Sequence, residues 1–122
     1  MLHEKLTERI ITCEIEVHRQ LGPGLFEANY QAASAIEFTY AGLSFLREPT
    51  LPVFYRDVKV GQYRPDFIVE NLVVVEIKSV ERYDPVFAAQ VLTYLRLTKL
   101  SVGLLLNFNR PVLTDGIKRF VL

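Results

Sequence analysis

The first forty residues carry apolar positions at helical spacing. Five of them are four, three, four and four positions apart, which places them along one side of an amphipathic helix: Leu6, Ile10, Cys13, Val17 and Leu21. The segment 22–24 (Gly-Pro-Gly) ends this helix, because proline cannot extend it and glycine permits a sharp turn. A second helix is predicted from residue 26 to about residue 40, with Gly42 as its stop. We expect His18 on the surface of the first helix.

After residue 42 the pattern becomes typical of strands. Strands are predicted over residues 43–47, 51–55, 58–69, 72–78, 101–107 and 116–122. Residues 73–75 are all valine, as in strands that are buried on both faces. Asp84 and Pro85 predict the start of a third helix, because aspartate caps free amide groups and proline fits the first helical position. This order of elements predicts an α/β or α+β domain around a mixed sheet.

Composition limits the size and the partners of this domain. The chain has 122 residues, half of them hydrophobic, so one globular domain over residues 1–122 is expected. Basic and acidic residues number 14 each, so any nucleic-acid contact must come from a local basic patch. The single cysteine excludes an intrachain disulfide and fits a reducing compartment. No apolar run reaches the roughly 20 residues that span a bilayer, and we expect a cytoplasmic protein.

The charged end of the valine strand holds the candidate chemistry. Glu76 and Lys78 are two residues apart, so in a strand both side chains point to the same face. They follow a run that must be interior, and a buried carboxylate requires a cation, a metal or strong hydrogen-bond donors. Asp66 lies ten residues earlier, on the preceding predicted strand. These three residues are the first candidates for a functional site.

The loop between the two strands decides whether the carboxylates meet. Residues that oppose each other across an antiparallel ladder share a face. A three-residue loop over 70–72 places Asp66 opposite Glu76, and Asn71 tolerates the left-handed conformation that such a loop needs. A two-residue loop over 70–71 places Val75 opposite Asp66 and sends the carboxylates to opposite faces. The sequence permits both registers.

A converged pair of carboxylates would suit a hard divalent cation. Two carboxylates about 4 Å apart repel each other unless a cation lies between them. Oxygen ligands of this kind favour Mg²⁺ or Mn²⁺, which can polarise a phosphodiester and acidify a water molecule. Lys78 could orient that water or stabilise developing negative charge. The alternative is a purely structural salt-bridged trio at the end of the sheet.

Five motifs occur in order along nearly the whole chain, and they resemble the GxxExxY protein family, a branch of the PD-(D/E)xK nuclease-like superfamily. They are Gly24-Leu25-Phe26-Glu27-Ala28-Asn29-Tyr30, Tyr63-Arg64-Pro65-Asp66-Phe67, Val75-Glu76-Ile77-Lys78, Gln90-Val91-Leu92-Thr93-Tyr94-Leu95 and Gly103-Leu104-Leu105-Leu106-Asn107-Phe108. The resemblance implies a restriction-endonuclease-like core, with a mixed central sheet of about four to five strands flanked by helices. It also implies Asp66 and Glu76 as metal ligands and Lys78 as the catalytic lysine.

The same resemblance implies three further site residues. Glu27 matches a helical acidic residue that often completes the metal site, and Gln90 and Tyr94 match a QxxxY motif that lines the cleft. We add the carbonyl of Ile77 as a fourth metal ligand. Two plainer interpretations stay open: Glu27 could simply complement the helix dipole, and the QxxxY residues could be buried polar groups with satisfied hydrogen bonds.

Two functions compete at this point. The first is a Mg²⁺- or Mn²⁺-dependent nuclease, which predicts that Asp66 and Glu76 lie within about 5 Å of each other and are open to solvent. The second is a non-catalytic module that binds nucleic acid or protein, which predicts that Lys78 closes a bridge to the carboxylates and leaves no cavity. A homodimer is a further expectation, because the predicted edge strands offer a pairing surface.

Overall fold

The protein folds into three α-helices, seven β-strands and one short 3₁₀-helix. The computed structural model describes residues 1–122. The elements are α1 (Glu4–Leu21), α2 (Glu27–Tyr40), β1 (Phe45–Arg47), β2 (Leu51–Tyr55), β3 (Val58–Tyr63), β4 (Phe67–Val69), β5 (Val73–Lys78), α3 (Pro85–Thr98), β6 (Val102–Asn107), η1 (Leu113–Gly116) and β7 (Ile117–Val121). None of the helices is both long enough and apolar enough to cross a lipid bilayer.

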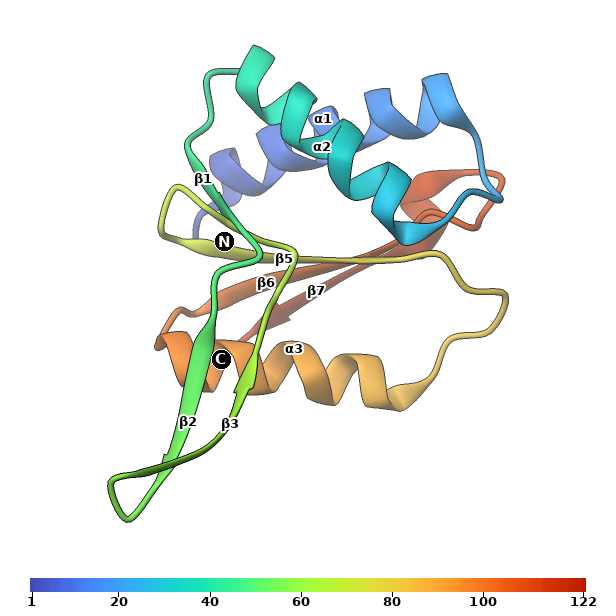
Figure 1. Ribbon diagram of the computed structural model, residues 1–122. Helices are drawn as coiled ribbons and strands as arrows, with labels where there is room; N and C mark the ends of the chain where they lie inside the picture. The colour runs from blue at the N-terminus through green and yellow to red at the C-terminus, as the bar shows by residue number, and fades with distance from the viewer.

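Five strands form a mixed central sheet, and the other two form a separate hairpin. The order in the sheet is β1-β4-β5-β6-β7; β5 and β6 are parallel, and the other neighbours are antiparallel. Helices α1 and α2 cover one face of the sheet and α3 covers the other (Figure 1). The expected α+β architecture, a mixed sheet of four to five strands flanked by helices, is therefore confirmed.

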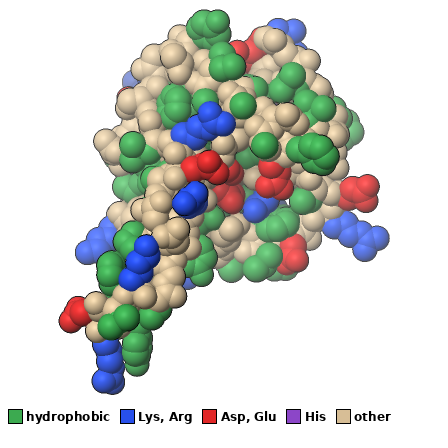
Figure 2. Space-filling model, viewed as in Figure 1, with side chains coloured by type: hydrophobic (Ala, Val, Ile, Leu, Met, Phe, Trp, Pro, Cys, Tyr) green, Lys and Arg blue, Asp and Glu red, His purple; other side chains and the backbone are tan.

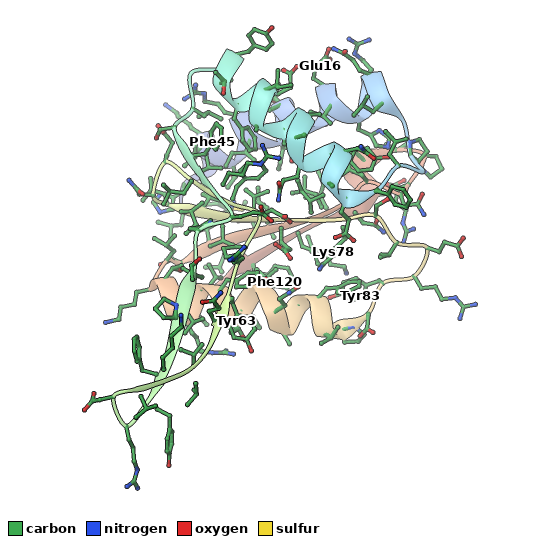
Figure 3. All side chains as sticks on the ribbon, in the orientation of Figure 1. Glu16, Phe45, Tyr63, Lys78, Tyr83 and Phe120 are labelled. Atoms are coloured by element: carbon green, nitrogen blue, oxygen red, sulfur yellow. The ribbon has the colours of Figure 1, made fainter.

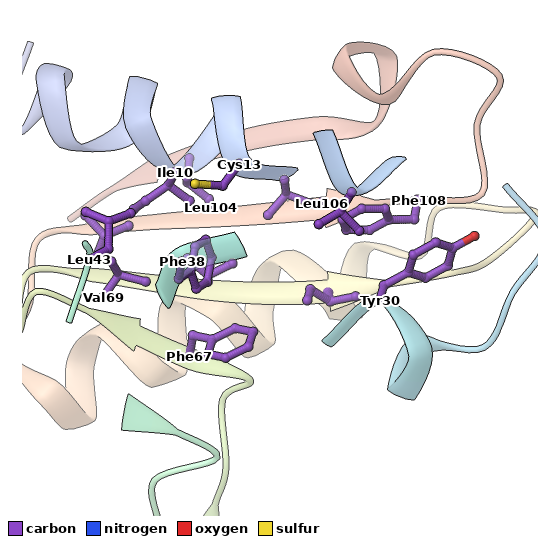
Figure 4. Packing of buried hydrophobic residues seen from close by; sticks show 14 of the residues in the cluster. Ile10, Cys13, Tyr30, Phe38, Leu43, Phe67, Val69, Leu104, Leu106 and Phe108 are labelled. Atoms are coloured by element: carbon purple, nitrogen blue, oxygen red, sulfur yellow. The ribbon is translucent and has the colours of Figure 1, made fainter. Parts of the chain in front are cut away.

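The alternation of side chains along β5 fixes which groups face which helix. Val73, Val75 and Ile77 belong to the main core cluster under α1 and α2, together with aromatic residues such as Phe38 and Phe67 (Figure 4). Val74 belongs to the smaller cluster on the α3 face. Because side chains alternate along a strand, Glu76 and Lys78 also point to the α3 face.

The turn between β4 and β5 has the three-residue form. The ladder pairs Phe67 with Val75 and Val69 with Val73, so Asp66 continues opposite Glu76. Glu70 and Asn71 have φ values of 53° and 54°, and the N–H of Leu72 donates to the carbonyl of Val69 at 3.0 Å, so a tight turn over residues 69–72 precedes the ladder. The register that joins the two carboxylates is therefore the one that forms.

The prediction of one long strand over residues 58–69 is wrong, because residues Arg64-Pro65-Asp66 interrupt it. β3 ends at Tyr63 and β4 begins at Phe67. Pro65 has no amide hydrogen to donate to a ladder. Beyond the break β2 and β3 pair only with each other, and they leave the body of the protein as a projecting hairpin (Figure 1).

The first helix buries the middle of the predicted stripe together with three polar residues, Thr7, Glu14 and His18, whereas Leu21 at its end is exposed. Ile10, Cys13 and Val17 are buried as expected. His18 is buried too, and its Nε2 lies 2.7 Å from the carbonyl oxygen of Arg110, so its expected surface position is wrong. Glu14 is fully buried on the same side of the helix. These positions are one helical turn from stripe residues, so packing against the sheet covers them as well.

Candidate active site

Asp66 directly precedes β4, at the end of the sheet where β5 extends past its neighbour. Its Oδ2 accepts a hydrogen bond from the backbone N–H of Ile77 at 2.7 Å, so the carboxylate takes the place of a missing strand partner. Its Oδ1 accepts from Nε2 of Gln31 on α2 at 2.7 Å. Gln31 is held in turn by Nε of Arg47, which donates to Oε1 at 2.9 Å. The Asp66 side chain is thereby fixed from both the sheet and the helix layer.

Glu76 is the neighbouring carboxyl and is only 5% exposed. Its Oε1 accepts a hydrogen bond from the backbone N–H of Asp66 at 3.1 Å, and its Oε2 lies 3.4 Å from Nζ of Lys78. Burial, together with the charge and the carboxyl group of Asp66, raises the pKa of Glu76 to about 8. The charge of Lys78 lowers the pKa by a smaller amount. One ammonium group therefore does not compensate two adjoining carboxylates.

Lys78 reaches from the end of β5 into the space between the sheet and α3 (Figure 3). Its Nζ lies 4.9 Å from the ring centroid of Phe87 and makes a cation–π contact. The side chain is half-buried and lines a pocket. The lysine thus presents its charge to the carboxylates on one side and to an open cavity on the other.

Ile77 contributes its backbone rather than its side chain. The side chain is fully buried in the core. In an extended strand the N–H and C=O of one residue point to the same side, and the N–H of Ile77 meets Asp66. Its carbonyl oxygen is therefore directed to the same edge as the Asp66 carboxylate.

A pocket of about 380 Å³ opens beside this group, between the end of β5, the N-terminal half of α3 and the base of the hairpin. Its walls are Tyr63, Lys78, Val86, Phe87, Ala89, Gln90 and Thr93. Gln90 thus faces the cleft, as the QxxxY motif implies. Tyr94 lies beneath it, 2% exposed, with its ring 6.2 Å from that of Tyr63. Burial and the nearby charges of Glu76 and Asp66 raise the pKa of the Tyr94 hydroxyl.

Glu27 is placed elsewhere. It is exposed at the start of α2, and its Oε2 lies 3.4 Å from the backbone N–H of Ser79, the residue after β5. The hydroxyl of Ser79 donates to the carbonyl of Leu25 at 2.6 Å, so this contact joins the start of α2 to the end of β5. No three acidic, histidine or cysteine side chains converge closely enough to hold one ion. The structure therefore brings Asp66, Glu76, Lys78 and the Ile77 backbone together, without Glu27.

Three residues around the site were not predicted from the sequence: Gln31, Arg47 and Glu14. Gln31 directly follows a motif tyrosine, but nothing in its spacing points to Asp66. Glu14 did carry a signal, because it lies four residues after Ile10 and three before Val17, which is the spacing of the buried stripe. Its two carboxyl oxygens are buried without a hydrogen-bond partner. Asp66 is close enough for its charge to raise the pKa of Glu14.

Comparison with known proteins gives this arrangement a family. The sequence profile of the PD-(D/E)XK nuclease superfamily matches residues 4–120. The chain belongs to this superfamily. No curated protein and no solved structure matches the chain significantly. The resemblance is thus confirmed for the superfamily and its restriction-endonuclease-like core, while the narrower GxxExxY branch rests on the motifs alone. Pro65-Asp66 and Glu76-Ile77-Lys78 supply the residues for which the superfamily is named.

The donor set suits the divalent metals that PD-(D/E)XK nucleases generally use. The carboxylates of Asp66 and Glu76 and the carbonyl of Ile77 are hard oxygen ligands at one edge of the sheet. Mg²⁺ is commonly held by one or two protein carboxylates, with water and substrate phosphate completing its coordination. Burial and, after it, the charge of Asp66 raise the pKa of Glu76, and a divalent cation beside the two carboxylates would oppose both effects.

Each of the two candidate functions predicts some features that the structure has and some that it lacks. Asp66 and Glu76 lie next to each other, since Oε1 of Glu76 accepts from the backbone N–H of Asp66, but Glu76 is nearly closed to solvent. Lys78 does bridge to Glu76, as the binding module requires, yet a cavity remains beside it.

Proposed function

We propose that the chain is a divalent-metal-dependent nuclease that hydrolyses phosphodiester bonds of nucleic acid. The observation that carries the proposal is the convergence of Asp66, Glu76 and Lys78 at one edge of the sheet, beside an open pocket. Membership of the PD-(D/E)XK nuclease superfamily supports the same chemistry. Asp66, Glu76 and the Ile77 carbonyl would hold Mg²⁺ or Mn²⁺.

Each residue then has a defined task. A bound divalent cation would polarise the phosphodiester and acidify the attacking water. Asp66 is fixed by Gln31 and by the Ile77 amide, so its ligand oxygens need little reorganisation. Lys78 would orient the water and stabilise the negative charge that develops on the phosphate. Gln90 would contact the substrate from the opposite wall of the pocket.

Two residues have less direct parts in this proposal. Tyr94 would support the floor of the cleft, because it packs against Tyr63 and is itself buried. Glu27 is kept as a predicted additional ligand, and Glu27→Gln tests it. A ligand role predicts weaker metal binding in that variant. A role in joining α2 to β5 predicts unchanged metal binding and a lower free energy of unfolding.

A non-catalytic binding module is the second candidate. The observation that favours it is the ion pair between Lys78 and Glu76, because a lysine held by a buried carboxylate is less free to act on a substrate. This candidate predicts binding of nucleic acid or protein without cleavage, whether or not a divalent metal is present.

A cleavage assay separates the two candidates. End-labelled single-stranded and duplex DNA and RNA are incubated with the protein and Mg²⁺ or Mn²⁺, and parallel reactions contain EDTA. The nuclease predicts metal-dependent cleavage that falls roughly 100- to 1,000-fold in Asp66→Asn and Lys78→Met. Lys5→Met on the exposed face of α1 is the matched control for the lysine, and circular dichroism verifies that each variant is folded. Cleavage that persists in both site variants would refute the proposal.

A further inference from the structure

The β2–β3 hairpin projects from the body of the protein beyond α3 (Figure 1). Every residue of β3 is exposed, and of β2 only Leu51 and Val53 are partly covered. The hairpin is anchored at its base, where Leu51 pairs with Tyr63 and packs against the core cluster on the α3 face. An isolated two-stranded hairpin is only marginally stable in water. The contribution of such an exposed arm to folding therefore does not explain its presence.

The distal part of the arm exposes large apolar side chains. Phe54, Tyr55, Val58 and Val60 are 61–64% exposed. Clustered apolar groups on a surface mark places where another molecule binds. Figure 2 shows hydrophobic side chains along the arm, with Lys and Arg side chains between them.

The charge of the arm indicates the kind of partner. Residues 51–64 contain three basic residues, Arg56, Lys59 and Arg64, and one acidic residue, Asp57, in a chain that is neutral overall. The guanidinium of Arg56 lies 5.8 Å from the centroid of the Tyr55 ring. Cationic groups interleaved with exposed aromatic rings complement a polyanion that carries flat apolar groups. This is the local basic patch that a neutral chain needs for contact with nucleic acid.

The arm is continuous with the candidate active site. Tyr63, at its base, forms a wall of the pocket that Lys78 also lines. Alternation along β2 places Tyr55 on the same face as Leu51, the partner of Tyr63, about 13 Å along the strand, although the ladder shifts register between Val53 and Phe54. A strand of nucleic acid that follows this face reaches the pocket at Lys78.

We propose that the β2–β3 hairpin is a binding arm for single-stranded nucleic acid. Unpaired bases stack on Tyr55 and Tyr63, and backbone phosphates contact Arg56, which lies over the Tyr55 ring, and Arg64 at the base of the arm. Lys59 pairs with Phe54 and therefore points to the other face of the hairpin. Unpaired bases are favoured over a duplex because base pairing and stacking hide the base faces that aromatic rings contact. The inference rests on the proposed function for its substrate class, and it adds the form of the substrate and the path by which it reaches the site.

Binding without cleavage tests the arm separately from the chemistry. Fluorescence anisotropy is measured in EDTA with a short fluorescein-labelled single strand of DNA, and with the same sequence as a duplex. The wild-type protein should bind the single strand more tightly than the duplex. Tyr55→Ala should weaken binding about 5- to 150-fold. Arg56→Gln and Arg64→Gln should each reduce the slope of log K against log salt by about 0.7.

Matched controls lie on the opposite side of the fold. Tyr40→Ala removes an exposed tyrosine from the end of α2, and Lys5→Gln removes an exposed lysine from α1; both should leave binding unchanged. Equal binding of the single strand and the duplex would overturn the inference, as would equal losses in Tyr40→Ala and Tyr55→Ala. Light scattering tests another occupant of the hairpin. A wild-type dimer that Tyr55→Ala dissociates would show that a second copy of the chain binds there and would overturn the inference.

Failure of the binding-arm inference can be distinguished from failure of the proposed nuclease function. Wild-type cleavage that is lost in Asp66→Asn, together with binding that is indifferent to the arm variants, overturns this inference alone. Selective single-strand binding through the arm without cleavage under any metal condition overturns the nuclease and leaves the arm supported.

Discussion

Replacing Glu14 with glutamine should remove a large pH dependence from the stability of the protein. Glu14 is fully buried in α1, and neither carboxyl oxygen has a hydrogen-bond partner. The adjacent hydroxyl of Ser34 donates to the carbonyl of Tyr30 at 2.7 Å, so it is not available as a donor to a carboxylate. Burial is the main cause that raises the pKa of Glu14 to about 8, and the charges of Asp66 and Glu37 contribute.

The size of the effect follows from proton linkage. Between the ordinary pKa of 4.5 and the folded-state value of about 8, the carboxyl is neutral in the folded protein and ionised in the unfolded chain. The unfolded state then binds fewer protons, so stability is highest at low pH and falls by about 1.4 kcal/mol per pH unit across this window. From about pH 5 to about pH 8, Glu14 alone removes roughly 3–4 kcal/mol from the free energy of unfolding. Native domains have only about 5–15 kcal/mol in total.

Urea denaturation at several pH values measures this contribution. The wild-type protein is compared with Glu14→Gln and with Glu8→Gln, which changes an exposed glutamate on the same helix. Titrating groups that do not interact with Glu14 affect all three proteins equally and cancel in the difference. Glu14→Gln should gain stability relative to the wild type as pH rises, with a slope of about one proton, and Glu8→Gln should not. Parallel pH profiles for the wild type and Glu14→Gln would refute the reasoning.

Two further substitutions test the supports of the site. A Cβ at Gly103 would lie 2.7 Å from Cγ1 of Val91, so Gly103→Ala should force α3 away from β6 and lower the free energy of unfolding in urea by about 1–3 kcal/mol; unchanged stability would contradict this packing. Gln31→Leu removes the donor to Asp66, and we expect a roughly 10- to 100-fold loss of metal affinity or cleavage in a folded protein. Gln20→Leu, on the exposed side of α1, is its control, and equal activities of the two variants would contradict a positioning role for Gln31.

Local signals in the sequence were sufficient for most of the elements. The valine run at 73–75 predicts a central strand because every position is apolar, and Asp84 caps α3 through the N–H of Val86 at 2.9 Å, as its sequence indicates. The meeting of Asp66 with Glu76 was one of two permitted registers. Counting residues defines those two registers but does not choose between them; in the folded protein Val69 pairs with Val73, which leaves residues 70–72 outside the ladder.

The features that the sequence did not predict depend on contacts between distant segments. Residues 58–69 alternate well enough for one strand, and the break at Pro65 arises because Asp66 bonds to groups on β5 and α2 instead of continuing a ladder. His18 is polar, and its burial is explained only by the carbonyl of Arg110, which is 92 residues away in the chain. Glu27 carries a family motif, yet its position depends on how the start of α2 meets Ser79.

Anomalous diffraction from crystals soaked in Mn²⁺ shows whether the carboxylates of Asp66 and Glu76 bind a divalent metal. We expect an anomalous peak within coordination distance of both carboxylates, and no peak there in crystals of Asp66→Asn. A soaked crystal that shows no peak beside these two carboxylates, or that shows the same peak in the variant, would contradict a metal-dependent site at this position.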